Sequence, residues 1–123
     1  MRTRSLWHSF QCAFVGLWYV LRTERNMKIH FAISVLVILL AAILKLEVSD
    51  WSILVLAIGA IIAAEVGNTS IEAIVDLIAP EFHEQARIAK DVAAAAVLVL
   101  AGTAVVVGLL LIGPPLWIRL SRL

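Results

Sequence analysis

Hydrophobic residues dominate three long uncharged runs of this chain, at residues 31–44, 51–64 and 92–117. A helix that crosses a membrane needs about 20 mainly apolar residues. The third run reaches that length alone, and the first two reach it when their helices continue into the polar flanks. The pattern therefore predicts three membrane-spanning helices, which we place at residues 29–46, 51–79 and 92–117.

The N-terminal 28 residues show a different pattern. Large apolar residues recur there at spacings of three and four, with polar residues between them. They are Leu6, Trp7, Phe10, Phe14, Leu17, Trp18 and Leu21. This pattern is typical of an amphipathic helix in the membrane interface, and it also fits a helix docked on the bundle. The predicted fold is therefore all-α, with a surface helix at residues 1–28 and three transmembrane helices.

Composition and charge support a membrane protein and suggest its orientation. Hydrophobic residues make up 63% of the chain and charged residues 15%, whereas a soluble domain is typically about half apolar and about a quarter charged. Cytoplasmic segments are enriched in Lys and Arg. Residues 1–28 carry Arg2, Arg4, Arg22, Arg25 and Lys28. We therefore expect the N-terminus and the loop at residues 80–91 to be cytoplasmic.

A stripe of polar residues continues the second span toward that loop. It comprises Glu65, Asn68, Thr69, Glu72 and Asp76. At 3.6 residues per turn these positions fall within an arc of roughly 100°. Carboxylates inside a membrane are costly and face protein or water, and carboxylate and amide oxygens are ligands for hard divalent cations. The stripe indicates a site for a metal and phosphates, although a hydrogen-bonded seam between helices or a stripe emerging into the headgroups would show the same pattern.

Near the stripe the sequence resembles the prokaryotic diacylglycerol kinase family, which includes the undecaprenol kinases. Three blocks carry the resemblance: TERNMKIH at 23–30, EVGNTSIEAIVDLI at 65–78 and EFHEQARIAKDVAAAAVL at 81–98. The second fits the family pattern E-x-x-N-[ST]-x-I-E-x-x-[VI]-D. The chain has no P-loop, dinucleotide-binding or soluble-kinase motif.

The resemblance implies a homotrimer with active sites shared between neighbouring subunits. It implies that magnesium ATP phosphorylates the hydroxyl of a membrane lipid at the cytoplasmic face of the bacterial cell membrane. Glu65 matches the general base, and Glu24 and Glu72 match the acids that bridge the metal to the ATP phosphates. The positions that match residues ordering that site or contacting the nucleotide are Asn68, Asp76, Glu81, His83, Lys90 and Asp91.

Simpler interpretations of single residues stay open. Glu24 alone would pass for a solvated surface acid, and Lys90 with Asp91 for a pair at the start of a helix. We expect His8 and His30 to be interfacial rather than catalytic. The TERN and IAKDVAA forms resemble the Gram-positive and cyanobacterial branch of the family, which contains both undecaprenol and diacylglycerol kinases. From this resemblance we prefer undecaprenol as the substrate, with diacylglycerol as the alternative. A more distant alternative is a proton or cation conductor, but the polar stripe stops at Glu65, and a conductor needs a polar path to both faces.

Overall fold

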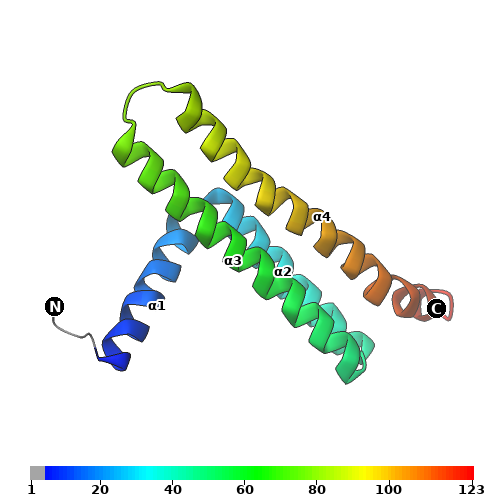
Figure 1. Cartoon of the computed structure of the whole chain (residues 1–123). Coiled ribbons are helices and arrows are strands. Elements are labelled where there is room, and N and C mark those ends of the chain that lie inside the picture. Colours follow the sequence, from blue (N-terminus) through cyan, green and yellow to red (C-terminus); the bar gives the residue numbers. More distant parts are fainter. Residues whose placement is uncertain (1–4) are drawn as a thin grey trace.

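The computed structural model describes residues 5–123, and every regular element in that part of the chain is an α-helix. The elements are α1 (Leu6–Thr23), α2 (Arg25–Leu44), α3 (Val48–Ile78) and α4 (Glu84–Leu120). In Figure 1, α3 and α4 run antiparallel and side by side, α2 lies along the first half of α3, and α1 leaves the bundle at an angle. Arg2 and Arg4, which contributed to the predicted orientation, lie outside the described residues.

The predicted all-α architecture with three long apolar helices is confirmed. The helices α2, α3 and α4 are each long and apolar enough to cross a membrane. Few side chains are fully buried, among them Ala41, Leu54, Val97 and Ile112, while most large apolar side chains point outward. A soluble monomer rarely exposes such continuous apolar surface. These outward faces are suited to hydrocarbon.

A corner at Glu24 separates α1 from α2. Glu24 has extended backbone angles (φ −91°, ψ 120°), its N–H donates to the carbonyl of Val20, and its own carbonyl accepts from Lys28 N. The predicted surface helix at residues 1–28 therefore ends at Thr23 among the described residues, and the first span begins at Arg25 rather than residue 29. The corner leaves the Glu24 side chain half-buried where α1 turns away from the bundle.

The predicted loop at residues 80–91 is shorter than expected, because α4 begins at Glu84. His83 caps this helix, and its Nδ1 accepts a hydrogen bond from Gln85 N. Arg87 contacts Glu84 at 2.6 Å and Asp91 at 2.8 Å, at helical spacings of three and four. Such pairs support a first turn, so Lys90 and Asp91 lie on a helix and not in a loop.

The last helix does not end at residue 117, the predicted end of the third span shortly after Pro114 and Pro115. The helix continues through both prolines to Leu120, although its last turns bend away from the line of the preceding ones in Figure 1. Proline removes one backbone donor and crowds the preceding turn, and a helix in a membrane protein can absorb this as a local bend. Arg119 helps to hold this end, because its Nη1 donates to the Ile43 carbonyl at 3.0 Å.

The turn between α2 and α3 depends on a left-handed residue. Lys45 has φ 54° and ψ 53°, and Leu46 N donates to the carbonyl of Ala41, as in a Schellman motif. Glycine usually occupies this position, because a Cβ atom is strained there by about 1–2 kcal/mol. The short turn places α3 directly beside α2.

Replacing Lys45 by glycine should therefore stabilise the protein by about 1 kcal/mol, since the Cβ strain disappears. Lys45→Ala is the matched control, because it removes the charge and keeps the Cβ atom. Thermal unfolding followed by circular dichroism in detergent micelles measures both. Equal unfolding midpoints for the two variants would contradict the strain argument.

Candidate functional site

The polar stripe lies on one face of α3, and it is buried at Glu65 and exposed at Asp76, nearer the end of the helix. Glu65 is 2% exposed and Thr69 8% exposed. Asn68 and Glu72 are half-buried, and Asp76 is exposed. With 31 residues, α3 is about 46 Å long at 1.5 Å per residue, against a hydrocarbon thickness of about 30 Å. The stripe therefore runs from the apolar bundle out into water.

Glu65 is the deepest charged residue of the stripe, and its neighbour on α2 is His30. His30 Nε2 lies 3.4 Å from Glu65 Oε1, and the His30 side chain is 19% exposed. This separation is an ion-pair distance, and it is long for a hydrogen bond. Glu65 Oε1 has no hydrogen-bond partner among the described residues. The charges of Glu24 and Glu72 also act on this carboxyl, so three acids from two parts of the chain share one electrostatic environment.

One turn further along α3, Asn68 and Glu72 are joined. Asn68 Nδ2 donates to Glu72 Oε1 at 3.2 Å. Asn68 Oδ1 and Thr69 Oγ1 are buried and have no hydrogen-bond partner within the described part of the chain. An unpaired buried polar atom costs about 1–3 kcal/mol. These two oxygens are therefore positions where a ligand or a neighbouring subunit would be stabilised.

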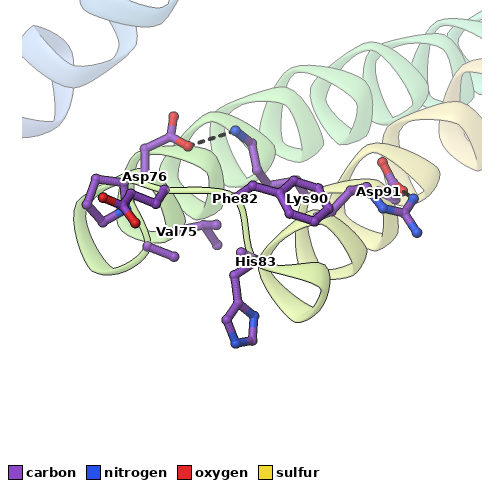
Figure 2. A pocket seen from close by; sticks show the side chains of 11 residues that line it. Val75, Asp76, Phe82, His83, Lys90 and Asp91 are labelled. Atoms are coloured by element: carbon purple, nitrogen blue, oxygen red, sulfur yellow. Dashed lines mark hydrogen bonds and ion pairs between the residues drawn. The ribbon is translucent and has the colours of Figure 1, made fainter.

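Asp76 continues the stripe at the surface and meets α4. Lys90 Nζ donates to Asp76 Oδ1 at 2.7 Å, and the charge of Glu72 also acts on Lys90. The pair lies in a cavity of about 430 Å³ that the α3–α4 connection encloses in part. Figure 2 shows Lys90 reaching across to Asp76, with the ring of His83 pointing away from the pair.

The candidate residues thus form two adjoining groups. Glu24, Glu65, Asn68 and Glu72 belong to the inner one. The outer group lines the cavity of Figure 2 and consists of Asp76, Glu81, His83, Lys90 and Asp91. Asp91 in this group is engaged by Arg87, and the ring of His83 caps α4. The Glu72 charge that acts on Lys90 links the two groups.

Sequence reasoning missed two residues of these groups. His30 was expected at the interface, but it contacts the most buried carboxylate. Its place in the TERNMKIH block was the available signal, because that block also carries Glu24. Arg87 is not among the predicted site residues, but it lines the cavity and its guanidinium donates to Asp91. The partner of a side chain on another helix cannot be obtained from one-dimensional spacing.

The donor atoms fit a hard cation only in part. Among residues 5–123 no group of three or more His, Cys, Asp or Glu side chains is placed to hold a metal ion. Glu72 and the unpaired Asn68 Oδ1 are nevertheless oxygen donors side by side on one face. Mg²⁺ is commonly held by one or two carboxylates together with substrate phosphates. The residues therefore fit a Mg²⁺ ion that arrives with a phosphate ligand.

Fold and site define a class: a small helical membrane protein with a charged site at one end of its bundle. A family model described as prokaryotic diacylglycerol kinase matches residues 11–112, and the chain belongs to this family. It is 43% identical over 109 residues to a diacylglycerol kinase of Synechocystis and 41% identical over 108 residues to an undecaprenol kinase of Bacillus subtilis. Each match covers 88% of this chain. The matched region is 62% of the length of the Synechocystis protein and 88% of the length of the Bacillus protein.

The unpaired hydroxyl of Thr69 generates a prediction. Thr69→Val should leave the unfolding midpoint unchanged or raise it, because the variant removes a buried oxygen that has no partner within the chain. Thr103→Val is the control, since Thr103 Oγ1 donates to the Val99 carbonyl at 2.9 Å. Thermal unfolding in micelles compares the two. A loss of stability for Thr69→Val larger than that of the control would mean that the hydroxyl has a partner beyond this chain.

Proposed function

We propose that this protein transfers the γ-phosphoryl group of ATP to the hydroxyl of a membrane lipid alcohol. In this reaction the lipid oxygen bonds to the γ-phosphorus, the bond to the β–γ bridging oxygen breaks, and ADP leaves. The hydroxyl proton passes to the Glu65 carboxylate. Transfers of this kind depend mainly on positioning and on electrostatic stabilisation, so the placement of charges is the relevant structural property.

The observation that carries this proposal is the depth of Glu65 at the apolar end of the stripe. A carboxylate that is 2% exposed has few water contacts, so a hydroxyl that reaches it meets a base with little competition from water. The long chains of a lipid alcohol stay in hydrocarbon, which keeps its hydroxyl near this layer. Phosphates stay in water, and the stripe connects the two layers.

The remaining residues take roles that follow from their positions. Glu24 and Glu72 would hold Mg²⁺, with Asn68 ordering Glu72 through its hydrogen bond. A bound Mg²⁺ would supply charge neutralisation on the phosphates. The outer group (Asp76, Glu81, His83, Lys90 and Asp91) would contact the nucleotide. Lys90 is half-buried and lies beside the cavity, so its ammonium group is placed to offset phosphate charge.

Undecaprenol is our preferred substrate, and diacylglycerol is the alternative. The relative matched over most of both chains is named undecaprenol kinase, and another relative of similar identity is named diacylglycerol kinase. Both lipids present one primary hydroxyl on long apolar chains. The preference rests on the TERN and IAKDVAA sequence forms. We also propose a homotrimer with shared sites in the bacterial inner membrane, with the N-terminus and the site facing the cytoplasm.

A proton or cation conductor is less well supported. Such a protein needs polar groups along the full length of its path. From Trp51 to Ala64 the face of α3 beyond Glu65 is apolar apart from Ser52, whose hydroxyl donates to its own helix at Val48 O. Between Ser52 and Glu65 the helix therefore offers no polar path, as a one-sided kinase site requires.

Phosphate transfer from labelled ATP in detergent–lipid micelles tests the function. We expect transfer to undecaprenol, and loss of at least about 100-fold in Glu65→Gln with ATP binding intact, because the amide cannot take the proton. Transfer to diacylglycerol alone would show that diacylglycerol, and not undecaprenol, is the substrate. Transfer to neither lipid by a folded protein would overturn the proposal. Full turnover by Glu65→Gln would show that Glu65 is not the base.

Glu72→Gln should weaken binding of magnesium ATP by about tenfold or more, a loss typical of perturbed metal coordination. The control is Glu47→Gln, an exposed acid that precedes the opposite end of the same helix, and it should leave affinity unchanged. Isothermal titration with a non-hydrolysable ATP analogue and Mg²⁺ measures both variants. Equal affinities for wild type and Glu72→Gln would exclude the metal role of Glu72.

A further inference from the structure

The contact between His30 and Glu65 has a defined place in the bundle. His30 lies on the second turn of α2, and its Nε2 faces Oε1 of Glu65 on α3 at 3.4 Å. The carboxylate is 2% exposed, while the imidazole is 19% exposed. The Glu65 side chain is therefore buried, whereas the His30 side chain beside it is partly exposed. The Ser34 hydroxyl donates to the His30 carbonyl at 2.7 Å. This bond adds a side-chain contact to the turn of α2 that carries His30.

The pair also marks the boundary between the apolar and polar parts of the bundle. A cavity of about 340 Å³ lies between α2, α3 and α4, and its lining residues are apolar apart from His30 and Ser34. The cavity reaches the level of Glu65, because its lining includes His30, which contacts Glu65, and Ile61, which lies four residues before it on α3. On the other side of the pair, the stripe continues to Glu72 and Asp76. A hydroxyl carried on an apolar chain would arrive at this level.

Other charges near the pair come from two elements. Glu24, at the corner between α1 and α2, and Glu72 on α3 both act on the Glu65 carboxyl. The residues that α4 contributes to the cavity beside His30 are apolar. Among residues 5–123, His30 is the group in ion-pair contact with Glu65 that can carry a positive charge, against the two further acids. Removing His30 would leave a buried carboxylate among like charges.

We propose that His30 is the positioning residue of Glu65 and its proton-transfer partner. His30 holds Oε1, which leaves the other carboxylate oxygen for the lipid hydroxyl. In that contact Nε2–H donates to Oε1. After Glu65 has taken the hydroxyl proton on its other oxygen, exchange with water at the open face converts His30 to its Nδ1–H tautomer. Nε2 then accepts the proton from Glu65, and Nδ1 releases its own proton to water, which restores Nε2–H. Glu65 returns to its charged form, and the proton count balances over one turnover. This inference rests on the proposed function for its chemistry, and on the 3.4 Å contact for its structure. Such contacts are often long without substrate and shorten in the reacting complex.

Two variants separate positioning from proton transfer. His30→Gln keeps an amide donor that can reach Oε1 but cannot take a proton, and His30→Ala removes both functions. The matched control is His8→Gln, an exposed histidine on α1. We expect His30→Ala to lower kcat by about tenfold or more, with KM for ATP changed less than about twofold. His30→Gln should recover part of kcat, while the acid limb of its pH–rate profile moves by at least about half a unit. Unchanged kcat and superimposable pH profiles for both variants would overturn the inference.

A second measurement does not require turnover. In protein labelled with ¹⁵N-histidine, the ring signals of the histidines are recorded by NMR in micelles at one fixed pH, with His30 assigned from His30→Gln. Because the two side chains are in contact, Glu65→Gln should move the ring signals of His30 and leave those of His8 in place. No movement would show that the two groups do not exchange charge, which overturns the pair. Movement in a protein that phosphorylates no lipid would support the pair and overturn the lipid-kinase proposal, so the two failures are distinguishable.

Discussion

Glu65 is a carboxylate enclosed by a bundle whose other buried side chains are nearly all apolar, and several features of the fold follow from this constraint. A lone ionised carboxylate is strongly destabilised in such surroundings. The bundle must therefore bring a polar partner to the same depth. It does so with α2, which places His30 against Glu65, and the tight turn at Lys45 holds α2 beside α3. The corner at Glu24 starts α2 close enough for the Glu24 charge to act on Glu65.

The graded burial of α3 matches a reaction between molecules from different phases. From Glu65 to Asp76 is eleven residues, or about 16 Å of helix. A lipid hydroxyl moves only a short way out of hydrocarbon, and a nucleotide triphosphate does not enter it. A rigid helix that carries a buried acid at one end of this distance and an exposed acid at the other spans the gap without a mobile loop. The contact between Asp76 and Lys90 then connects the exposed end to α4.

The sequence predicted the features that depend on many residues at once. The three spans follow from long apolar runs, the stripe follows from 3.6-residue periodicity, and the family follows from three motif blocks. The sequence did not predict features that depend on a single contact, such as where a helix begins or which side chain a residue meets. The His83 cap and the Arg87 pairs start α4 at Glu84, and α4 runs on through both prolines. The contact of His30 with Glu65 was not predicted, because the two residues are 35 positions apart on different helices, a separation that no local pattern encodes.

The unpaired oxygens of Asn68 and Thr69 are the places in this chain where a bound ligand would add hydrogen bonds. Each is buried without a hydrogen-bond partner among residues 5–123, at a cost of about 1–3 kcal/mol. Both lie on the turn between Glu65 and Glu72, where the proposed substrates would meet. A phosphate-bound cation would satisfy the Asn68 amide oxygen, and a bound hydroxyl donor would satisfy Thr69. Because both oxygens are buried and unpaired within residues 5–123, part of the stability of this end of α3 would depend on the site being occupied by ligands.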